Sequence, residues 1–231
     1  MNDVFKFKKF SVKQSPNVFK VGTDGVLLGC LANLSQARFI LDIGTGTGLL
    51  SFICAQRNTL AQITAIDSET EAFNLARENS ENSPFSSNIC VIHSDLHHFI
   101  SDKKFDYIIC NPPYFKASEQ EHLKHPVARY QLKLNYSSLI KRSKSLLSEN
   151  GRIGYILPFE SEQELLSLSE CSDLFPERIL RIRGIKNGRI RRTFLELSHK
   201  KQDVLPEEFY LEERPRIRSE RYKNLTSEFY L

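Results

Sequence analysis

From about residue 38 onward, short apolar runs alternate with longer segments of helical periodicity. Five of these runs are predicted to be strands: Phe39–Asp42, Ile63–Asp67, Ile89–Ile92, Tyr107–Asn111 and Ile153–Pro158. The segments between them predict helices at Leu49–Gln56, Glu69–Asn79 and Tyr136–Leu147, with Ser68 and Asn135 as N-caps. Apolar strands separated by helices are typical of a parallel sheet that is covered on both faces. The pattern therefore predicts an α/β fold.

The pattern changes after Pro158. A polar helix is predicted around Glu160–Ser169, and strands are predicted at Arg178–Arg183 and Thr193–Ser198. The Asn187-Gly188 pair between these strands favours a tight turn, so we expect an antiparallel hairpin at the edge of the sheet. Together with the five strands above, this predicts a mostly parallel seven-stranded sheet with an antiparallel C-terminal hairpin and helices on both faces.

The length of 231 residues suits a single domain. We divide it into an N-terminal lid and helix segment at 1–36, a ligand-binding core at 37–158 and C-terminal edge elements at 159–231. Hydrophobic residues make up 40% and charged residues 26%, which gives no support to a disordered or fibrous chain. No apolar run approaches the roughly 20 residues needed to cross a bilayer, and the N-terminus does not resemble a signal peptide. We therefore expect a cytoplasmic protein with no membrane partner.

The cysteines and histidines do not indicate a metal centre. The five cysteines are far apart and form no CxxC pair, so disulfide frameworks and zinc sites both lack their usual spacing. We expect these cysteines to be buried, reduced thiols. His122 and His125 form an HxxH segment, which we interpret as loop or surface histidines. No metal is predicted.

A glycine-rich segment, LDIGTGTG at Leu41–Gly48, follows a predicted strand and opens a predicted helix. Gly44, Gly46 and Gly48 allow the backbone to turn sharply and let a ligand approach without meeting a β-carbon. Nicotinamide- and flavin-binding folds share this motif, and an ordinary turn between a strand and a helix can also carry it. The glycines alone therefore predict a ligand-binding turn without identifying the ligand.

Acidic residues occur at the ends of three successive predicted strands. Asp42 ends the first strand, Asp67 ends the second and Asp95 follows the third. A carboxylate at Asp67 can accept hydrogen bonds from ribose hydroxyls, and one at Asp95 can accept from an adenine amino group. Asp42 leaves little room for the charge of a pyrophosphate, whereas a cofactor with a sulfonium, an ammonium and no phosphate suits it. These residues favour S-adenosylmethionine over a dinucleotide.

A second motif, NPPY at Asn111–Tyr114, directly follows the fourth predicted strand and would stand beside the methyl group of that cofactor. Pro112 and Pro113 fix φ and remove two N–H groups, which leaves a stiff segment. The Asn111 side-chain oxygen and the Pro112 carbonyl can accept the two hydrogens of an adenine amino group, and Tyr114 can stack on the base. The motif predicts catalysis by positioning and electrostatics. An ordinary proline turn is the alternative.

The order DIGTGTG, Asp67, Asp95, NPPY resembles the amino-methyltransferases of the Rossmann-like class I fold, which include adenine-N6, cytosine-N4 and protein glutamine-N5 enzymes. The segment FKVGTDGVLLGCLA at Phe19–Ala32, with Gln14 upstream, resembles the opening of the bacterial tRNA1(Val) (adenine(37)-N6)-methyltransferases. The ending RYKNLTSEFYL is similar to that family's tail, so the resemblance covers nearly the whole chain. It implies S-adenosylmethionine as cofactor and methylation of N6 of adenine 37 in the anticodon loop of tRNA1(Val).

In that family the KVGTD segment folds over the cofactor. Lys20 can meet the cofactor carboxylate, Gly22 permits an unusual turn, and Thr23 or Asp24 can cap a helix over Val26–Ala32. A capping helix without ligand contact is the alternative. The full set of predicted cofactor-binding residues is Lys20, Gly22, Thr23, Asp42, Gly44, Gly46, Gly48, Asp67, Asp95 and Asn111.

The charge of the chain is unevenly distributed. The net charge is only +4, but residues 178–192 carry seven cations and no acid. A folded RNA needs such a cationic platform, because NPPY can contact only one base. We therefore predict RNA binding by Arg178, Arg181, Arg183, Lys186, Arg189, Arg191 and Arg192. A solvated face is the ordinary alternative for a basic run.

Other functions remain open from the sequence. A protein glutamine methyltransferase of the release-factor type would use NPPY on a side-chain amide, but it normally carries a helical domain before the glycine-rich motif. A DNA adenine methyltransferase would be expected to add a sizeable recognition domain, for which residues 159–231 are too few. A non-catalytic RNA-binding module has no need of NPPY. We expect tRNA as the partner and a monomeric protein.

Overall fold

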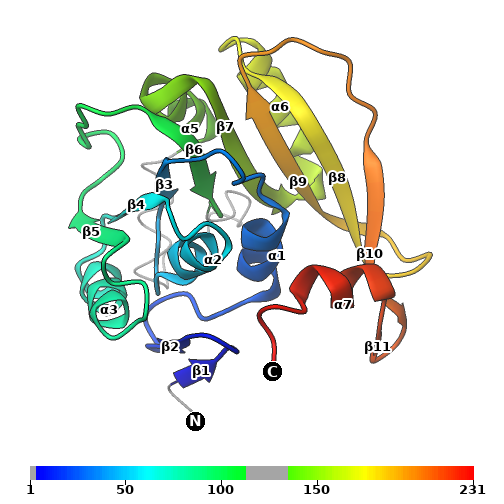
Figure 1. The fold of residues 1–231 in the computed structure, drawn as a ribbon. Coiled ribbons are helices and arrows are strands. Elements are labelled where there is room, and N and C mark those ends of the chain that lie inside the picture. Colours follow the sequence, from blue (N-terminus) through cyan, green and yellow to red (C-terminus); the bar gives the residue numbers. More distant parts are fainter. Residues whose placement is uncertain (1–3, 113–134) are drawn as a thin grey trace, which may run out of the picture.

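The computed structural model describes residues 4–112 and 135–231, so Pro113, Tyr114 and the HxxH segment lie outside the described residues. A large sheet is built from β3 (Phe39–Ile43), β4 (Gln62–Asp67), β5 (Ile89–His93), β6 (Phe105–Cys110), β7 (Leu147–Pro158), β8 (Phe175–Ile185), β9 (Ile190–Ser198), β10 (Glu207–Arg214) and β11 (Ile217–Arg218). The order across this sheet is β11-β10-β8-β9-β7-β6-β3-β4-β5 (Figure 1). Five of the eight neighbouring pairs are parallel. The predicted α/β class with a mostly parallel sheet is confirmed.

All seven predicted strands are present, and β8 and β9 form the predicted antiparallel hairpin. The hairpin is not at the edge of the sheet, however, because β10 pairs in parallel with β8, and β11 pairs with β10. Within β10 only Phe209 is fully buried. A strand with one buried side chain and four glutamates carries no apolar run, which is why the sequence pattern did not reveal it.

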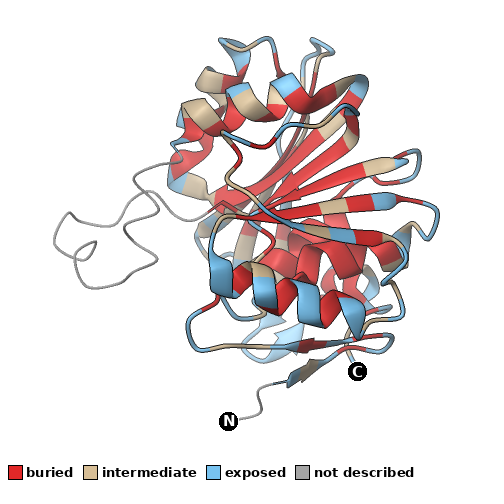
Figure 2. Ribbon diagram, turned by 90° about the vertical axis from the view of Figure 1, so that its left-hand side faces the viewer, coloured by how far each residue is buried: buried red, intermediate tan, exposed pale blue. Residues whose placement is uncertain are grey.

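Helices cover both faces of the sheet, as predicted. The helices are α1 (Thr23–Leu31), α2 (Leu49–Arg57), α3 (Thr70–Glu81), α5 (Tyr136–Leu146), α6 (Glu162–Glu170) and α7 (Glu220–Thr226). Helices α1, α2 and α3 lie on one face, and α5 and α6 lie on the other (Figures 1 and 2). Two separate apolar clusters result, one containing Leu28 and Phe52 and the other containing Leu139 and Leu165.

The starts of two helices test the predicted N-caps. Asn135 caps α5 as predicted, because its side chain accepts a hydrogen bond of 2.8 Å from the Ser138 N–H. The prediction of Ser68 for α3 is wrong, since the N-cap is Glu69 and no side chain caps it. Asp67 instead accepts a hydrogen bond of 3.0 Å from the Glu69 N–H, so the acid that ends β4 also holds the start of α3.

Helix α1 begins three residues earlier than predicted. Its N-cap is Gly22 and no side chain caps it, so the expected capping by Thr23 or Asp24 is wrong. Every residue from Gly25 to Leu31 is buried. The helix therefore starts where the chain becomes apolar enough to pack, and tertiary contacts rather than a polar cap fix its position.

The two ends of the described chain lie together (Figure 1). Strands β1 (Val4–Lys6) and β2 (Ser11–Lys13) form a small antiparallel sheet. The Phe7 ring stacks on Tyr230 with centroids 5.9 Å apart, and the Lys8 N–H donates to the Phe229 carbonyl at 2.9 Å. The C-terminal tail after α7 thus packs on the N-terminal segment.

The cysteines are free thiols, as expected, but they are not all buried. Cys30, Cys54 and Cys110 are buried, whereas Cys90 and Cys171 are exposed. In the described part of the chain, no three His, Cys, Asp or Glu residues are grouped so that they could hold a metal ion. A search of the same residues finds no helix with the length and apolar character of a membrane span.

Candidate active site

The glycine-rich loop joins β3 to α2 at the carboxyl edge of the sheet. Gly44, Gly46 and Gly48 have φ of +68°, +58° and +87°, which is the left-handed region that favours glycine. A β-carbon built on Gly44 would meet no atom within 4 Å. The backbone of the loop is therefore open on the side where a ligand can approach.

Asp42 lies beneath this loop and is completely buried. Its Oδ2 accepts hydrogen bonds from the hydroxyls of Thr45 at 2.6 Å and Ser51 at 2.7 Å. Its Oδ1 is buried and has no hydrogen-bond partner among the described residues. Burial raises the pKa of Asp42 from 3.8 to about 6, although the two hydroxyls act in the opposite direction. Thr45 and Ser51 were not singled out in the sequence, because hydroxyls near a turn are too common to be a signal.

Asp67 and Asp95 stand at the ends of the next two strands. Asp67 accepts a hydrogen bond of 2.8 Å from the Gly46 N–H, in addition to the one from Glu69. Burial raises the pKa of Asp67, and these backbone N–H groups lower it. Asp95 follows β5 and accepts a hydrogen bond of 2.7 Å from the His97 N–H. The fold therefore brings the three predicted acids to neighbouring strand ends beside the loop, as the sequence indicated.

Asn111 and Pro112 follow β6, the parallel neighbour of β3. Ile43 and Cys110 are register partners, so Gly44 and Asn111 are the next residues on the two adjacent strands. The Asn111 side-chain oxygen is buried and has no hydrogen-bond partner within residues 4–112 and 135–231. Pro112 is buried beside it. The first half of NPPY thus borders the glycine-rich loop and offers an unpaired acceptor.

Residues 11–22, which we call the strap, lie against the glycine-rich loop. Val18 is buried with two side chains of α3, and its Cγ1 lies 3.9 Å from a β-carbon built on Gly46. Gln14 shapes the end of the strap, because its side-chain oxygen accepts a hydrogen bond of 2.9 Å from the Val21 N–H. Lys20 and Gly22 are exposed and Thr23 is half-buried. The strap therefore approaches the glycine-rich loop at Val18.

Five of the seven predicted RNA-binding cations contact groups of the protein itself. Arg178 donates to the Leu31 carbonyl, and the other four pair with carboxylates, namely Arg181 with Glu162, Arg183 with Glu208, Lys186 with Glu213 and Arg192 with Asp24. The Arg181 pair is the most enclosed, because the Glu162 side chain is only 2% exposed. Arg178 and Arg181 point to opposite faces of the sheet, toward α1 and α6.

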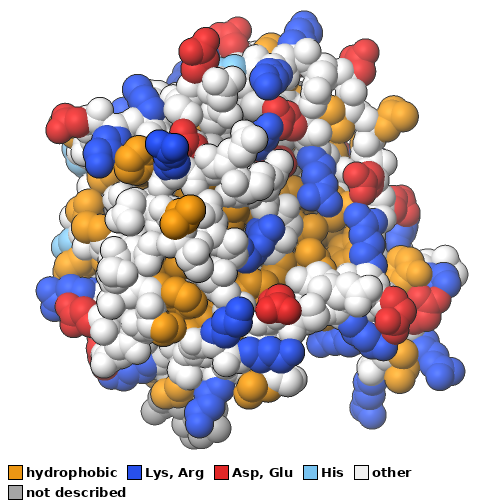
Figure 3. All heavy atoms as spheres, in the orientation of Figure 1, with side chains coloured by type: hydrophobic (Ala, Val, Ile, Leu, Met, Phe, Trp, Pro, Cys, Tyr) orange, Lys and Arg blue, Asp and Glu red, His pale blue; other side chains and the backbone are white. Residues whose placement is uncertain are grey.

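Arg189 and Arg191 differ from these five. Both are exposed, and neither guanidinium group has an ion pair or hydrogen bond with any other residue that the structure describes. With Arg218 they line a groove between the β8–β9 turn and the β10–β11 turn. Arg192 is the register partner of Pro158, so this groove lies at the same edge of the sheet as the glycine-rich loop. Lys and Arg side chains stand close together over this part of the molecule in Figure 3.

Comparison with known proteins agrees with this geometry. Residues 9–158 match the family described as Methyltransferase small domain. A tRNA1(Val) (adenine(37)-N6)-methyltransferase from Flavobacteriaceae bacterium (strain 3519-10) is 41% identical over 98% of this chain and 97% of its own length. Its namesake from Flavobacterium psychrophilum is 36% identical over 99% of both chains. A predicted O-methyltransferase from Agrobacterium tumefaciens superimposes with a TM-score of 0.66 at 17% identity, over 89% of this chain and 96% of its own.

The open glycine-rich loop, the strand-end acids and the sheet order define an S-adenosylmethionine-dependent methyltransferase with a Rossmann-like fold. The residues present suit this cofactor, because the Gly44 side of the loop is open and Asp42 holds a buried carboxylate oxygen without a partner in the described chain. The chain belongs to the methyltransferase small domain family and, within it, to the tRNA1(Val) (adenine(37)-N6)-methyltransferases.

Proposed function

We propose that this protein transfers the methyl group of S-adenosylmethionine to N6 of adenine 37 in tRNA1(Val), the reaction for which its relatives are named. The observation that carries the proposal is the unpaired side-chain oxygen of Asn111. A buried acceptor without a partner costs free energy, so this atom calls for a donor from outside the described chain. The amino group of an adenine is such a donor. The position of Asn111 next to Gly44 of the glycine-rich loop supports this assignment.

In the reaction a bond forms between N6 and the methyl carbon, the carbon–sulfur bond breaks, and one amino proton is released to solvent. The bound cofactor supplies an electrophilic methyl group on a sulfonium. Asn111 and the Pro112 carbonyl accept the two amino hydrogens and turn the nitrogen lone pair toward that methyl group. Tyr114, outside the described residues, is assigned to stack on the base.

The three acids take distinct roles toward the cofactor in this proposal. Asp67 accepts from the ribose hydroxyls and Asp95 from the adenine amino group. Asp42 provides a negative charge beneath the loop for the cationic methionine portion, which is consistent with its buried, unpaired oxygen. Lys20 binds the cofactor carboxylate. Gly22, the N-cap of α1, and Thr23, its first residue, follow shortly after Lys20 and are assigned to the same part of the cofactor site.

For the RNA, we assign the phosphate contacts to Arg189 and Arg191, with Arg218 completing the groove. Their exposure and lack of described partners support this role. The five partnered cations of the hairpin hold its shape, since each would have to give up a contact within the protein to reach a phosphate. The groove and the loop share one edge of the sheet, so a single RNA can contact both.

The test uses purified protein, labelled S-adenosylmethionine and total tRNA from a strain that lacks the gene. We expect label in N6-methyladenosine of tRNA1(Val), and no label in a tRNA1(Val) transcript whose adenine 37 is replaced by guanine. The Asn111→Ala variant should leave both RNAs unlabelled. Label in another nucleoside, or transfer to a protein glutamine instead of tRNA, would refute the proposed substrate.

A further inference from the structure

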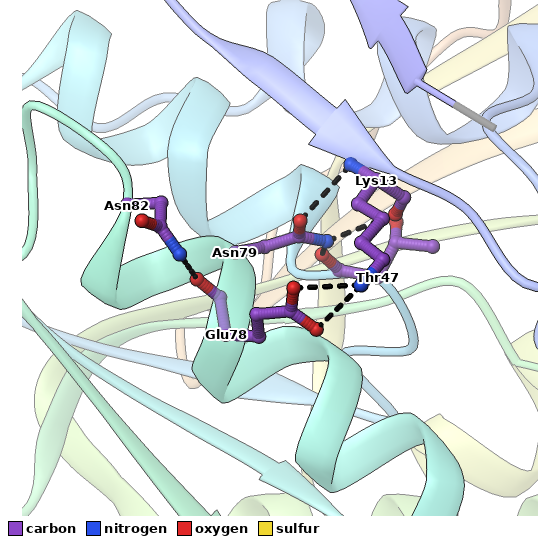
Figure 4. Close-up of polar contacts among 5 residues, drawn as sticks. All are labelled: Lys13, Thr47, Glu78, Asn79 and Asn82. Atoms are coloured by element: carbon purple, nitrogen blue, oxygen red, sulfur yellow. Dashed lines mark hydrogen bonds and ion pairs between the residues drawn. The ribbon is translucent and has the colours of Figure 1, made fainter. Parts of the chain in front are cut away.

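Asn79, on the buried side of α3, joins three separate segments of the chain (Figure 4). Its side-chain oxygen accepts a hydrogen bond of 2.9 Å from the Lys13 N–H. Its amide nitrogen donates to the Lys13 carbonyl at 3.0 Å and to the Thr47 carbonyl at 2.9 Å. One amide therefore pairs with both backbone groups of a strap residue, as a neighbouring strand would, and also holds the glycine-rich loop.

The Thr47 carbonyl lies between the two glycines whose backbone conformation shapes the second half of that loop. Thr47 is flanked by Gly46 and Gly48, which both have positive φ, so the backbone here adopts a conformation that few residues share. On its other side the loop is fixed by the bond from the Gly46 N–H to Asp67. The start of the loop is held separately, because the Gly44 and Thr45 N–H groups donate to the Ile66 carbonyl. Asn79 and Asp67 hold the part of the loop that follows, at Gly46 and Thr47.

The hydrogen bonds between Asn79 and the Lys13 backbone attach the strap to α3. The strap runs from Lys13 to Val18, which packs on α3 and approaches Gly46, and on to Val21, which Gln14 holds through its N–H. Ser15 and Asn17 of the strap also donate to the Glu71 carboxylate of α3. Lys13 is the strap residue whose attachment to α3 also involves the glycine-rich loop. Because the same amide holds Thr47, the two parts of the cofactor site are fixed to each other.

We propose that Asn79 is a positioning residue for S-adenosylmethionine: it holds the strap and the glycine-rich loop in the relative geometry that binds the cofactor. The proposal concerns cofactor binding alone and does not depend on which RNA is methylated. Asn79 acts through Lys13 and Thr47. A purely structural role would lower the stability of the protein without changing the affinity of the folded form.

A neighbouring polar contact provides a matched control. Asn82 is the C-cap residue that follows α3, and its side-chain amide donates to the Glu78 carbonyl at 2.7 Å (Figure 4). Among the described residues, its side chain has no hydrogen bond to the strap. Lys13 also forms an ion pair with Glu78 at 2.7 Å, but both side chains are 50% exposed. Exposed ion pairs contribute little, so we assign the attachment of Lys13 to Asn79. Asn82→Ala, which changes neither the Lys13 nor the Thr47 contact, should not disturb the site.

The experiment measures cofactor affinity by calorimetry at a temperature where thermal unfolding shows each variant to be folded. We expect Asn79→Ala to weaken S-adenosylmethionine binding about tenfold or more, because three hydrogen bonds are lost and the one to the Thr47 carbonyl is buried. Asn79→Asp, which keeps the acceptor for Lys13 but loses both donated bonds, should also bind more weakly. Amide exchange of Lys13 in the cofactor-free protein should accelerate in Asn79→Ala, whereas the Asn82→Ala variant should match the wild type in affinity.

A folded Asn79→Ala protein with wild-type affinity would overturn the proposal, and so would an equal loss in Asn82→Ala. If Asn79→Ala does not fold, Gln14→Ala decides the question, because it loosens the strap without touching α3. Weaker cofactor binding in Gln14→Ala would support a strap that must be positioned, and unchanged binding would reject it.

Discussion

At the scale of single residues, two buried acids at adjacent strand ends are satisfied in different ways. Asp67 receives backbone N–H groups that belong to the loop and to α3, so its carboxylate organises the chain around it. Asp42 receives only two hydroxyls, and one of its oxygens has no partner in the described chain. Its pKa of about 6 reflects this incomplete compensation for burial.

This pKa predicts a pH dependence of cofactor binding. Asp42 is protonated below about pH 6 and ionised above it, and the ionised form attracts the cationic cofactor. We expect the affinity for S-adenosylmethionine to rise as pH increases through about 6, by at most about tenfold per pH unit, and then to level off. Calorimetry across this range, with Asp42→Asn as the control, checks the prediction. A wild-type profile as flat as that of the variant would contradict it.

In the cofactor-free protein the raised pKa of Asp42 makes stability fall as pH rises, which is opposite to its effect on cofactor affinity. The folded-state pKa of Asp42 lies above its unfolded value of 3.8. The folded protein therefore binds more protons than the unfolded chain between these values, and the contribution of this group to stability is lost as pH rises through about 6. Cofactor binding and stability should thus respond to pH in opposite directions in this window.

Asp67 and Asn111 predict a division between binding and turnover. Asp67→Ala should weaken cofactor binding roughly tenfold to a hundredfold, because a charge-assisted hydrogen bond contributes about 1.5–3 kcal/mol. Asn111→Ala should keep cofactor affinity within a few-fold and abolish methyl transfer, since its proposed partner is the substrate amino group. Calorimetry and single-turnover assays measure the two effects separately. A folded Asn111→Ala protein unable to bind the cofactor would show that this division is wrong.

At the scale of elements, the β8–β9 hairpin is predicted to bind phosphates through its turn. Replacing Arg189 and Arg191 with Ala should weaken tRNA binding and lower the slope of log affinity against log salt by about 0.7–0.9 per lost contact. Cofactor affinity should not change. A matched double variant, Lys103→Ala with Lys104→Ala, removes the same charge just before β6, at the opposite edge of the sheet. Wild-type salt dependence in the hairpin variant would assign these arginines to a solvated face.

The sequence predicted elements well where burial made a pattern. The apolar strands β3 to β6, the three helices between the strands and the hairpin were all found within a few residues. Only the second half of β7 was predicted, because its first half, residues 147–152, is mostly polar. Strand β10 was missed because only Phe209 is fully buried in it. The helix starts were misjudged where backbone or tertiary contacts replace a side-chain cap, as at Glu69 and Gly22.

The candidate site shows the same limit at finer detail. Glycines and strand-end acids stand at fixed offsets from predicted strands, so their convergence could be read from the sequence. Asn79 could not be recognised, because its three partners come from segments 66 and 32 residues away. The ion pair between Arg181 and Glu162 could not be predicted from the sequence either. Such pairs distinguish the cations that hold the hairpin from the cations that face solvent.

At the scale of the whole molecule, the N-terminal hairpin and the C-terminal tail stabilise each other. Phe229 is 2% exposed and belongs to the cluster that includes Phe7 and Phe10. Phe229→Ala should lower the free energy of unfolding by about 3–5 kcal/mol and accelerate amide exchange at Lys8. Leu231, which is 84% exposed, provides the control, since Leu231→Ala should change stability by less than about 0.5 kcal/mol. Chemical denaturation of both variants tests this, and equal stabilities would contradict it.

The bond from the Lys8 ammonium to the Ser227 carbonyl closes a ring of chain that spans 219 residues. Closing a flexible loop of that size costs about 5 kcal/mol of conformational entropy, beyond a constant, when nothing else restrains it. Once the large sheet has formed, most of that entropy has already been lost. The N-terminal segment and the C-terminal tail then need only a short movement to meet. During refolding the N-terminal segment around Lys8, which leads into the strap, should therefore become ordered after the sheet. The cofactor site would then be completed late, and cofactor binding would report the final stage of folding while sheet formation reports an earlier one.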